Sequence, residues 1–137
     1  MPSIASKWMI VGVAALTSVL AIGQDAKNPF DGVWTVDMNR AGTHVLSQRV
    51  ELRDREGLFY NVQKRYAGDP NGVCRNLRAS IERVVFDETS LSFVVARSKQ
   101  IQGCSDLIFV LRWNGTNLVG TLDGTGDNGV VAVTLSR

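Results

Sequence analysis

The chain has 137 residues, and its 15 basic against 13 acidic side chains give a formal net charge of +2 at pH 7. Charge this close to balance argues against a protein that binds nucleic acid through bulk electrostatic attraction. One histidine and two cysteines are too few to build a zinc site from those residue types alone, and we expect neither a metal nor another cofactor.

The segment 1–23 predicts a secretory signal peptide. Lys7 is its only charged residue, and an uninterrupted run of apolar or small residues spans positions 8–22. Small residues at positions 21 and 23 fit a cut before Gln24, and a cut after Ala21 fits almost as well. The run is at the short end for a membrane span. We therefore expect a secreted or periplasmic protein with no stable membrane insertion after cleavage.

The remaining segment, 24–137, has the length of a single domain. Cys74 and Cys104 are its two cysteines, and an even count in an oxidising compartment predicts one disulfide. Closing a loop of about thirty residues would stabilise the fold by roughly 3–4 kcal/mol in the chain-entropy model. The chain has no Cys-x-x-Cys pattern that would favour a redox role.

Alternating residues predict three strands in the first half of the domain, at 30–38, 44–53 and 58–66. One face of the first strand holds Phe30, Gly32, Trp34 and Val36. The corresponding face of the second holds Leu46, Val50 and Leu52, and that of the third holds Leu58, Tyr60, Val62 and Tyr66. A four-residue turn at 54–57, ending on Gly57, is expected between the second and third strands because Gly accepts positive φ.

The middle of the domain fits either a strand or a helix. After an Asp-Pro-Asn-Gly turn at 69–72, the apolar residues up to position 81 keep one parity, and Val84 and Phe86 take the other. This pattern predicts a strand with a bulge near Glu82 and Arg83. A short helix over 75–84 is the competing interpretation, because some of the same apolar residues fit helical spacing. The strand is favoured. A turn at 87–90, a strand at 91–95 and a polar loop at 98–106 follow.

The last third of the chain predicts an antiparallel meander. Three apolar runs are separated by a tight two-residue turn at Asn114-Gly115 and by a longer Gly-rich loop at 123–129. One face of the first run holds Leu107, Phe109, Leu111 and Trp113, and one face of the last holds Val131, Val133 and Leu135. With about seven or eight strands at roughly ten-residue spacing, we expect an all-β domain that closes as a barrel or a barrel-like sandwich.

The sequence offers no catalytic constellation. The single histidine, His44, is expected on the surface, and neither Gly-x-Ser-x-Gly nor His-Glu-x-x-His occurs. The loop at 123–129 resembles a calcium loop only superficially, because it lacks the closing Glu. We therefore expect a protein that is not an enzyme. Asn114 also begins an Asn-x-Thr acceptor, which matters only in a eukaryotic source.

Arginines gather on one predicted hairpin. Arg49, Arg53 and Arg65 point outward from the expected second and third strands. If Arg49 and Arg65 lie opposite each other, they form a basic strip able to hold an acidic protein partner or an anionic ligand. The alternative is an ordinary solvated sheet face, balanced by neighbouring Glu and Asp side chains.

The segment Phe30-Asp-Gly-Val-Trp34 resembles the Gly-x-Trp start of lipocalin-like (calycin) barrels. That resemblance implies that Trp34 plugs the closed end of a β-barrel. The ending from Trp113 to Arg137, with Leu118-x-Gly120 and a final Val-x-Leu-x-Arg, is similar to the last hairpin of many small exported bacterial β domains.

Two functions follow as expectations. The first is a non-catalytic protein that holds a small apolar ligand inside the barrel. Its candidate lining residues are Trp34, Tyr60, Tyr66, Phe93, Phe109 and Trp113. The second is a protein–protein module, such as a hydrolase inhibitor or an immunity protein. A roomy apolar interior would favour the first function, and a filled core would favour the second.

Overall fold

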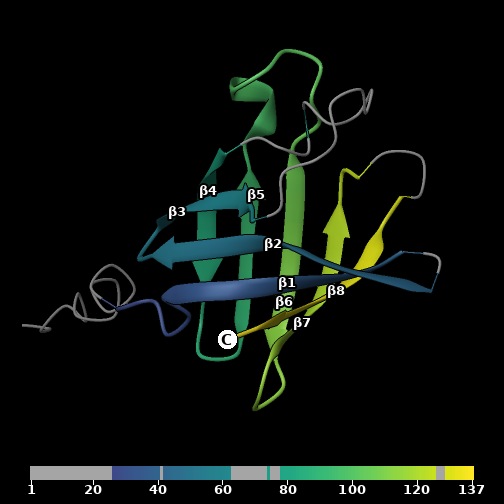
Figure 1. Ribbon diagram of the computed structural model, residues 1–137. Helices are drawn as coiled ribbons and strands as arrows, with labels where there is room; N and C mark the ends of the chain where they lie inside the picture. The colour runs from purple at the N-terminus through teal and green to yellow at the C-terminus, as the bar shows by residue number, and fades with distance from the viewer. Residues whose placement is uncertain (1–25, 41, 63–73, 75–77, 126–128) are drawn as a thin grey trace, which may run out of the picture.

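The computed structural model describes residues 26–40, 42–62, 74, 78–125 and 129–137 (Figure 1). The predicted signal peptide lies outside these residues, as do Arg65 and Tyr66. Within the described part of the chain, no helix is long and apolar enough to cross a membrane.

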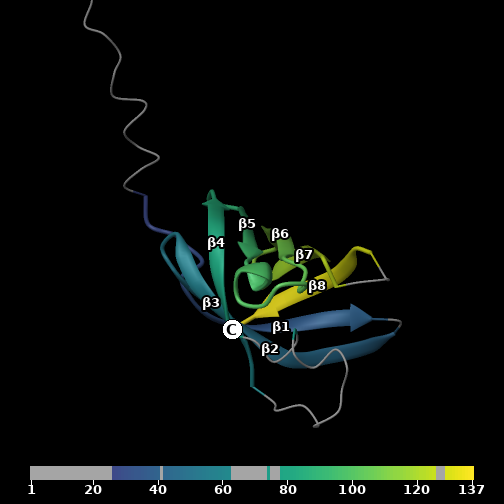
Figure 2. The same cartoon turned by 90° about the horizontal axis from the view of Figure 1, so that it is seen from above.

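The described residues form a closed antiparallel barrel in which each strand pairs with the next and β8 pairs with β1. The strands are β1 (Gly32–Arg40), β2 (Thr43–Arg53), β3 (Glu56–Asn61), β4 (Ala79–Phe86), β5 (Ser90–Val95), β6 (Leu107–Trp113), β7 (Leu118–Asp123) and β8 (Val131–Ser136). A short 3-10 helix, η2 (Arg97–Lys99), follows β5. β1 and β2 cross in front of β4, β5 and β6, and Figure 2 shows the strands following one another around the wall. The predicted all-β meander is confirmed, and the sheet closes on itself.

A β-bulge in β2 corrects the predicted face of that strand. Val36 pairs with Gln48, whereas Met38 pairs with Val45, so β2 carries one extra residue here. The extra residue reverses the inside–outside alternation beyond it. Leu46 was expected on the same face as Val50, but it is turned out to solvent, while Gln48 points inward and is buried.

The prediction of which β3 residues face the core was also wrong. The turn before it has two residues rather than four, because Arg53 pairs directly with Glu56. Asp54 takes the positive φ, of 58°, that was assigned to Gly57. The strand consequently buries Phe59 and turns Tyr60 outward.

Gly57 lies inside β3, where a Cβ atom would come within 2.2 Å of the backbone oxygen of Glu51. Its small size, rather than a positive φ, is what the fold requires.

The strand favoured for the middle of the domain is confirmed over 79–86, and so is its bulge. The pairing of β4 with β5 shifts between Glu82 and Val85, and Arg83 adopts a positive φ of 52°. The shift places Ile81 and Val84 on the same inner face although they differ in parity.

The β6–β7 turn is longer than expected. Trp113 pairs with Leu118, so four residues, 114–117, make the connection instead of two. The Asn114 side chain accepts hydrogen bonds from the backbone N–H groups of Thr116 and Asn117, at 2.9 and 2.8 Å. An Asx turn of this kind gives hydrogen-bond partners to the backbone N–H groups of a wider loop.

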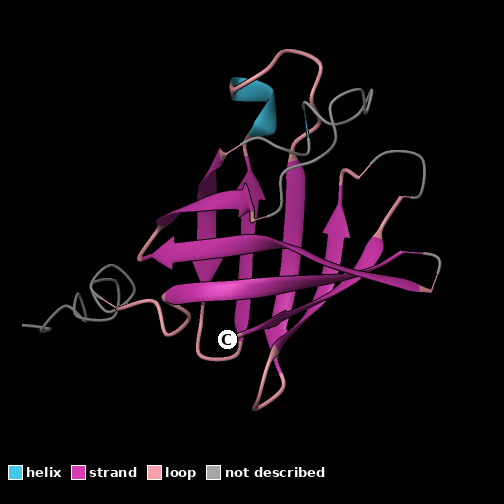
Figure 3. Ribbon diagram, viewed as in Figure 1, coloured by secondary structure: helices cyan, strands magenta, loops and turns pink. Residues whose placement is uncertain are grey.

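The predicted disulfide joins Cys74 to Cys104, whose Cα atoms are 5.6 Å apart. It ties the segment before β4 to the loop that contains η2, the helix coloured cyan in Figure 3. A disulfide indicates a non-cytosolic location.

Candidate functional site

The predicted lining aromatics divide between the two sides of the barrel wall. Trp34, Phe93 and Phe109 lie inside, each at most 1% exposed, and Trp113 is half-buried against the core. Tyr60 lies on the outer side, where the guanidinium carbon of Arg78 sits 5.6 Å from its ring centroid. Tyr66 is outside the described residues. The structure therefore does not gather the six residues around one space.

Aromatic side chains close the end of the barrel where β1 begins. The Trp34 indole N–H donates to the backbone oxygen of Phe30 at 2.9 Å, and its ring meets Trp113 edge-on at 6.2 Å. The guanidinium carbon of Arg137 lies 4.2 Å from the Trp34 ring centroid, in cation–π geometry. A buried ring whose only polar atom is bonded, and whose face is covered, seals this end.

The interior between the two ends is filled. The rings of Phe93 and Phe109 stack at 4.7 Å, and Phe59 reaches Phe109 at 6.2 Å. No residue of the buried apolar cluster is more than 6% exposed. Inward residues of all eight strands belong to this cluster, so the described side chains meet in the middle of the barrel. An eight-stranded barrel has room for little more than its own side chains.

Arg97 lies at the opposite end, in η2, and is only 9% exposed. Its guanidinium group donates to the backbone oxygens of Ser105 at 2.7 Å, Cys74 at 3.3 Å and Gly124 at 3.3 Å. These oxygens belong to three different loops between strands. The Arg97 guanidinium group and the nearby disulfide hold the three loops together. The Arg97 side chain therefore stabilises the fold at this end of the barrel.

Gln48 is the polar exception on the inner wall. Its side chain is 5% exposed, and its Oε1 atom has no hydrogen-bond partner among the residues that the structure describes. It faces Asn61, its neighbour across the β2–β3 ladder. A buried acceptor without a donor costs roughly 1–3 kcal/mol, so this carboxamide is a polar group inside the barrel that could take a further partner.

The arginine strip is not assembled as predicted. Arg49 lies opposite Tyr60 and Thr35, so it has no arginine across the ladder. Its Nη1 donates to the backbone oxygens of Leu46 and Gln48, both at 3.0 Å, next to the β2 bulge. Arg53 lies opposite Glu56, and Arg65 is outside the described residues. Arg49 is thereby engaged with its own strand.

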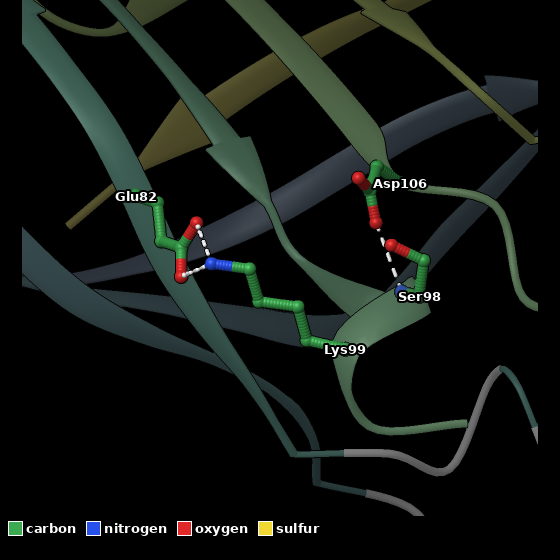
Figure 4. Close-up of polar contacts among 4 residues, drawn as sticks. All are labelled: Glu82, Ser98, Lys99 and Asp106. Atoms are coloured by element: carbon green, nitrogen blue, oxygen red, sulfur yellow. Dashed lines mark hydrogen bonds and ion pairs between the residues drawn. The ribbon is translucent and has the colours of Figure 1, made fainter. Parts of the chain in front are cut away.

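The carboxylates nearest to η2 are engaged within the protein (Figure 4). Lys99 Nζ contacts both oxygens of Glu82, at 2.7 and 2.9 Å. Asp106 accepts a hydrogen bond from the Ser98 N–H at 2.9 Å, and this bond holds the pKa of the Asp106 carboxyl below its usual value. Both acids support the loop between β5 and β6.

His44, the only histidine, is exposed on the outside of the β1–β2 hairpin. Its Nδ1 atom lies 2.9 Å from Asp37 on the neighbouring strand. This is an ordinary cross-strand pair. The described residues contain no group of three or more His, Cys, Asp and Glu side chains arranged to hold a metal ion.

The outer surface of β4 to β8 carries an uncharged patch that the sequence analysis missed. Outward residues in adjacent strands line up across the ladder, with Val85 beside Ser92, Ser92 beside Val110 and Val110 beside Thr121. We call this patch the neutral face. Its members are Val85, Ser92, Val94, Ile108, Val110, Val119, Thr121 and Ala132.

The neutral face is apolar where it is most accessible. Val85 is 62% exposed, Val110 55% and Ile108 46%. By contrast, the outward positions of β2 alternate Arg49, Glu51 and Arg53. The charged exterior of β2 is the usual one for a sheet in water.

The sequence did contain a signal for this surface. The run Leu107-Ile-Phe-Val-Leu111 has no polar residue on either face. An apolar pattern on both faces is typical of strands that are buried on both sides. In the barrel, Leu107, Phe109 and Leu111 are covered, whereas Ile108 and Val110 are not.

The chain matches no protein-family model, and no curated protein or solved structure matches it.

Proposed function

We propose that this protein is a non-catalytic, exported binding module that docks a partner protein on its neutral face. The observation that carries the proposal is β6, whose outward residues Ile108 and Val110 are apolar and exposed while its inward residues fill the core. Uncovered apolar surface of this kind marks interaction sites in soluble proteins.

The filled interior supports a function on the outside of the barrel. The stacked rings of Phe93 and Phe109 leave the middle of the barrel to side chains, and Trp34 seals one end. The two carboxylates beside η2 are paired or hydrogen-bonded, so they are committed to structure.

Native mass spectrometry of the mature protein, crosslinked in its own host before gentle purification so that a weakly bound partner is kept, tests this function. We expect the wild-type protein to carry a bound protein and the Val110→Lys variant to lose it. Val33→Lys is the matched control, because Val33 is an outward valine on β1 that is similarly exposed, at 49%. Equal retention by all three proteins would refute docking on the neutral face.

A second candidate function is the binding of a small ligand at the end of the barrel opposite Trp34. The unpaired Oε1 of Gln48 favours it, because a ligand hydroxyl or amide N–H could donate to that atom. The resemblance to lipocalin-like barrels also favours this candidate function. In the same native spectra, a small molecule that both lysine variants keep and that Gln48→Met loses would favour this function instead.

A further inference from the structure

We propose that the partner on the neutral face is a second copy of this chain, arranged about a two-fold axis. This inference rests on the proposed function and names its partner. A two-fold dimer uses the same patch on both copies, so the patch must be complementary to itself. The charges that border the neutral face meet this condition.

Arg112 and Asp123 stand at opposite ends of the neutral face. Along β6 the outward residues are Ile108, Val110 and Arg112, and on β7 they are Val119, Thr121 and Asp123. Because β6 and β7 are antiparallel, Asp123 lies beside Ile108 and Arg112 lies beside Val119. The two charges are therefore separated by the apolar rows between them.

Both charges are available to a partner. Arg112 is exposed and makes no ion pair with any residue that the structure describes. Asp123 is exposed, and its carboxylate accepts the N–H of the adjacent Gly124 at 2.8 Å. That local bond leaves the other carboxylate oxygen open to a cation.

One two-fold axis matches these charges. An axis that lies in the neutral face and runs across the strands reverses the strand direction of the second copy. It brings Arg112 of each copy to the end where Asp123 of the other copy lies, and it does so twice in the dimer. An axis along the strands would leave both arginines at one end and both aspartates at the other. Opposite charges across an interface select the first arrangement.

The size of the neutral face indicates a weak dimer. Five strands spaced about 4.8 Å apart, and rows that extend about 14 Å along each strand, give a patch of roughly 300 Å². A standard interface buries about 800 Å² on each partner. Self-association is therefore expected only as the concentration rises toward about 1 mM, as for weak and transient complexes.

Sedimentation velocity of the mature, disulfide-bonded protein tests the dimer over a concentration series that reaches about 1 mM. We expect concentration-dependent dimerisation of the wild type. Arg112→Glu and Asp123→Arg should each weaken it by about tenfold or more, because each places like charges together twice. The double variant exchanges the two charges and should restore the wild-type affinity. Arg53→Glu, on the charged side of the barrel, is the control and should dimerise as the wild type does.

Two results would overturn the proposal. One is a wild type that stays monomeric throughout the series. The other is a double variant that is no tighter than the single variants while all of them keep the wild-type circular dichroism spectrum. A monomeric protein whose Val110 still contacts another protein would remove the dimer and leave the proposed function standing. If the protein is monomeric and Val110 contacts no other protein, both the dimer and the proposed function are refuted.

Discussion

At the scale of single residues, the β2 bulge shows how a change of register moves a side chain from the core to solvent. Gln48 keeps the inward alternation of Val50 and lies against the core, and the bulge between Gln48 and Val45 turns Leu46 out to solvent. Bulges depend on pairing with a neighbouring strand, so the residue pattern of β2 alone could not reveal this one. The same limit explains the wrong placement of Leu46.

Replacement of Gln48 by methionine should raise the free energy of unfolding by about 1 kcal/mol, because the variant no longer buries an unpaired acceptor. Methionine keeps the unbranched shape of glutamine and adapts to irregular space. Urea unfolding of both proteins measures the difference. A loss of stability comparable to the expected gain would mean that the carboxamide is hydrogen-bonded in solution.

Asp87 should make stability depend on pH. Its carboxylate accepts the N–H groups of Thr89 and Ser90, both at 2.8 Å, and these bonds lower its pKa from 3.8. Because the folded pKa lies below the unfolded one, the stabilisation is present above pH 3.8 and is lost as the pH falls through the folded pKa.

Asp87→Asn should therefore be less stable than the wild type at neutral pH, and the difference should shrink at pH about 2.5. Urea midpoints at the two pH values measure the effect. A difference of the same size at both would show that ionisation of Asp87 does not contribute.

At the scale of elements, the positions of the strands could be predicted, whereas the faces of some could not. Period-two alternation located the first strand and those of the last third, because their apolar residues point to one core. The face of β3 was wrong because Asp54, rather than Gly57, takes the positive φ of the turn. Asp tolerates that conformation, and the sequence does not say which residue uses it.

The β4 bulge offers a test at this scale. Arg83 holds a φ of 52° with an exposed side chain, so its replacement removes little packing. Arg83→Gly should leave stability within about 1 kcal/mol of the wild type, because Gly accepts this φ freely. Arg83→Val should be less stable than Arg83→Gly by roughly 1–2 kcal/mol, because a β-branched residue resists it. Thermal unfolding of both variants measures this; equal stabilities would contradict a positive φ at the bulge.

At the scale of the whole molecule, the disulfide and the antiparallel meander could be predicted from the sequence, whereas closure into a barrel was left open beside a sandwich and the neutral face was missed. Two cysteines leave one possible pairing within the chain. The neutral face depends on which strands become neighbours. Val85 and Thr121 are distant in sequence, and they join one patch only because β4 to β7 pair in order.

Replacement of Cys74 and Cys104 by serine should lower the free energy of unfolding by roughly 3–4 kcal/mol, because the unfolded chain regains the entropy of an open loop. Arg97 would still bridge the backbone oxygens of Ser105 and Gly124, so the barrel should still fold. Guanidinium unfolding of the oxidised wild type and the double variant measures the change. Matching midpoints would show that the disulfide adds no stability.

The neutral face as a docking surface is tested most directly by photo-crosslinking in the living host. A photoreactive side chain is placed at Val110, and in a separate protein at Val33, the matched outward valine on β1. A partner covering β6 predicts a specific adduct of higher mass from position 110 and none from position 33. Adducts from both positions, or from position 33 alone, would contradict docking on the neutral face.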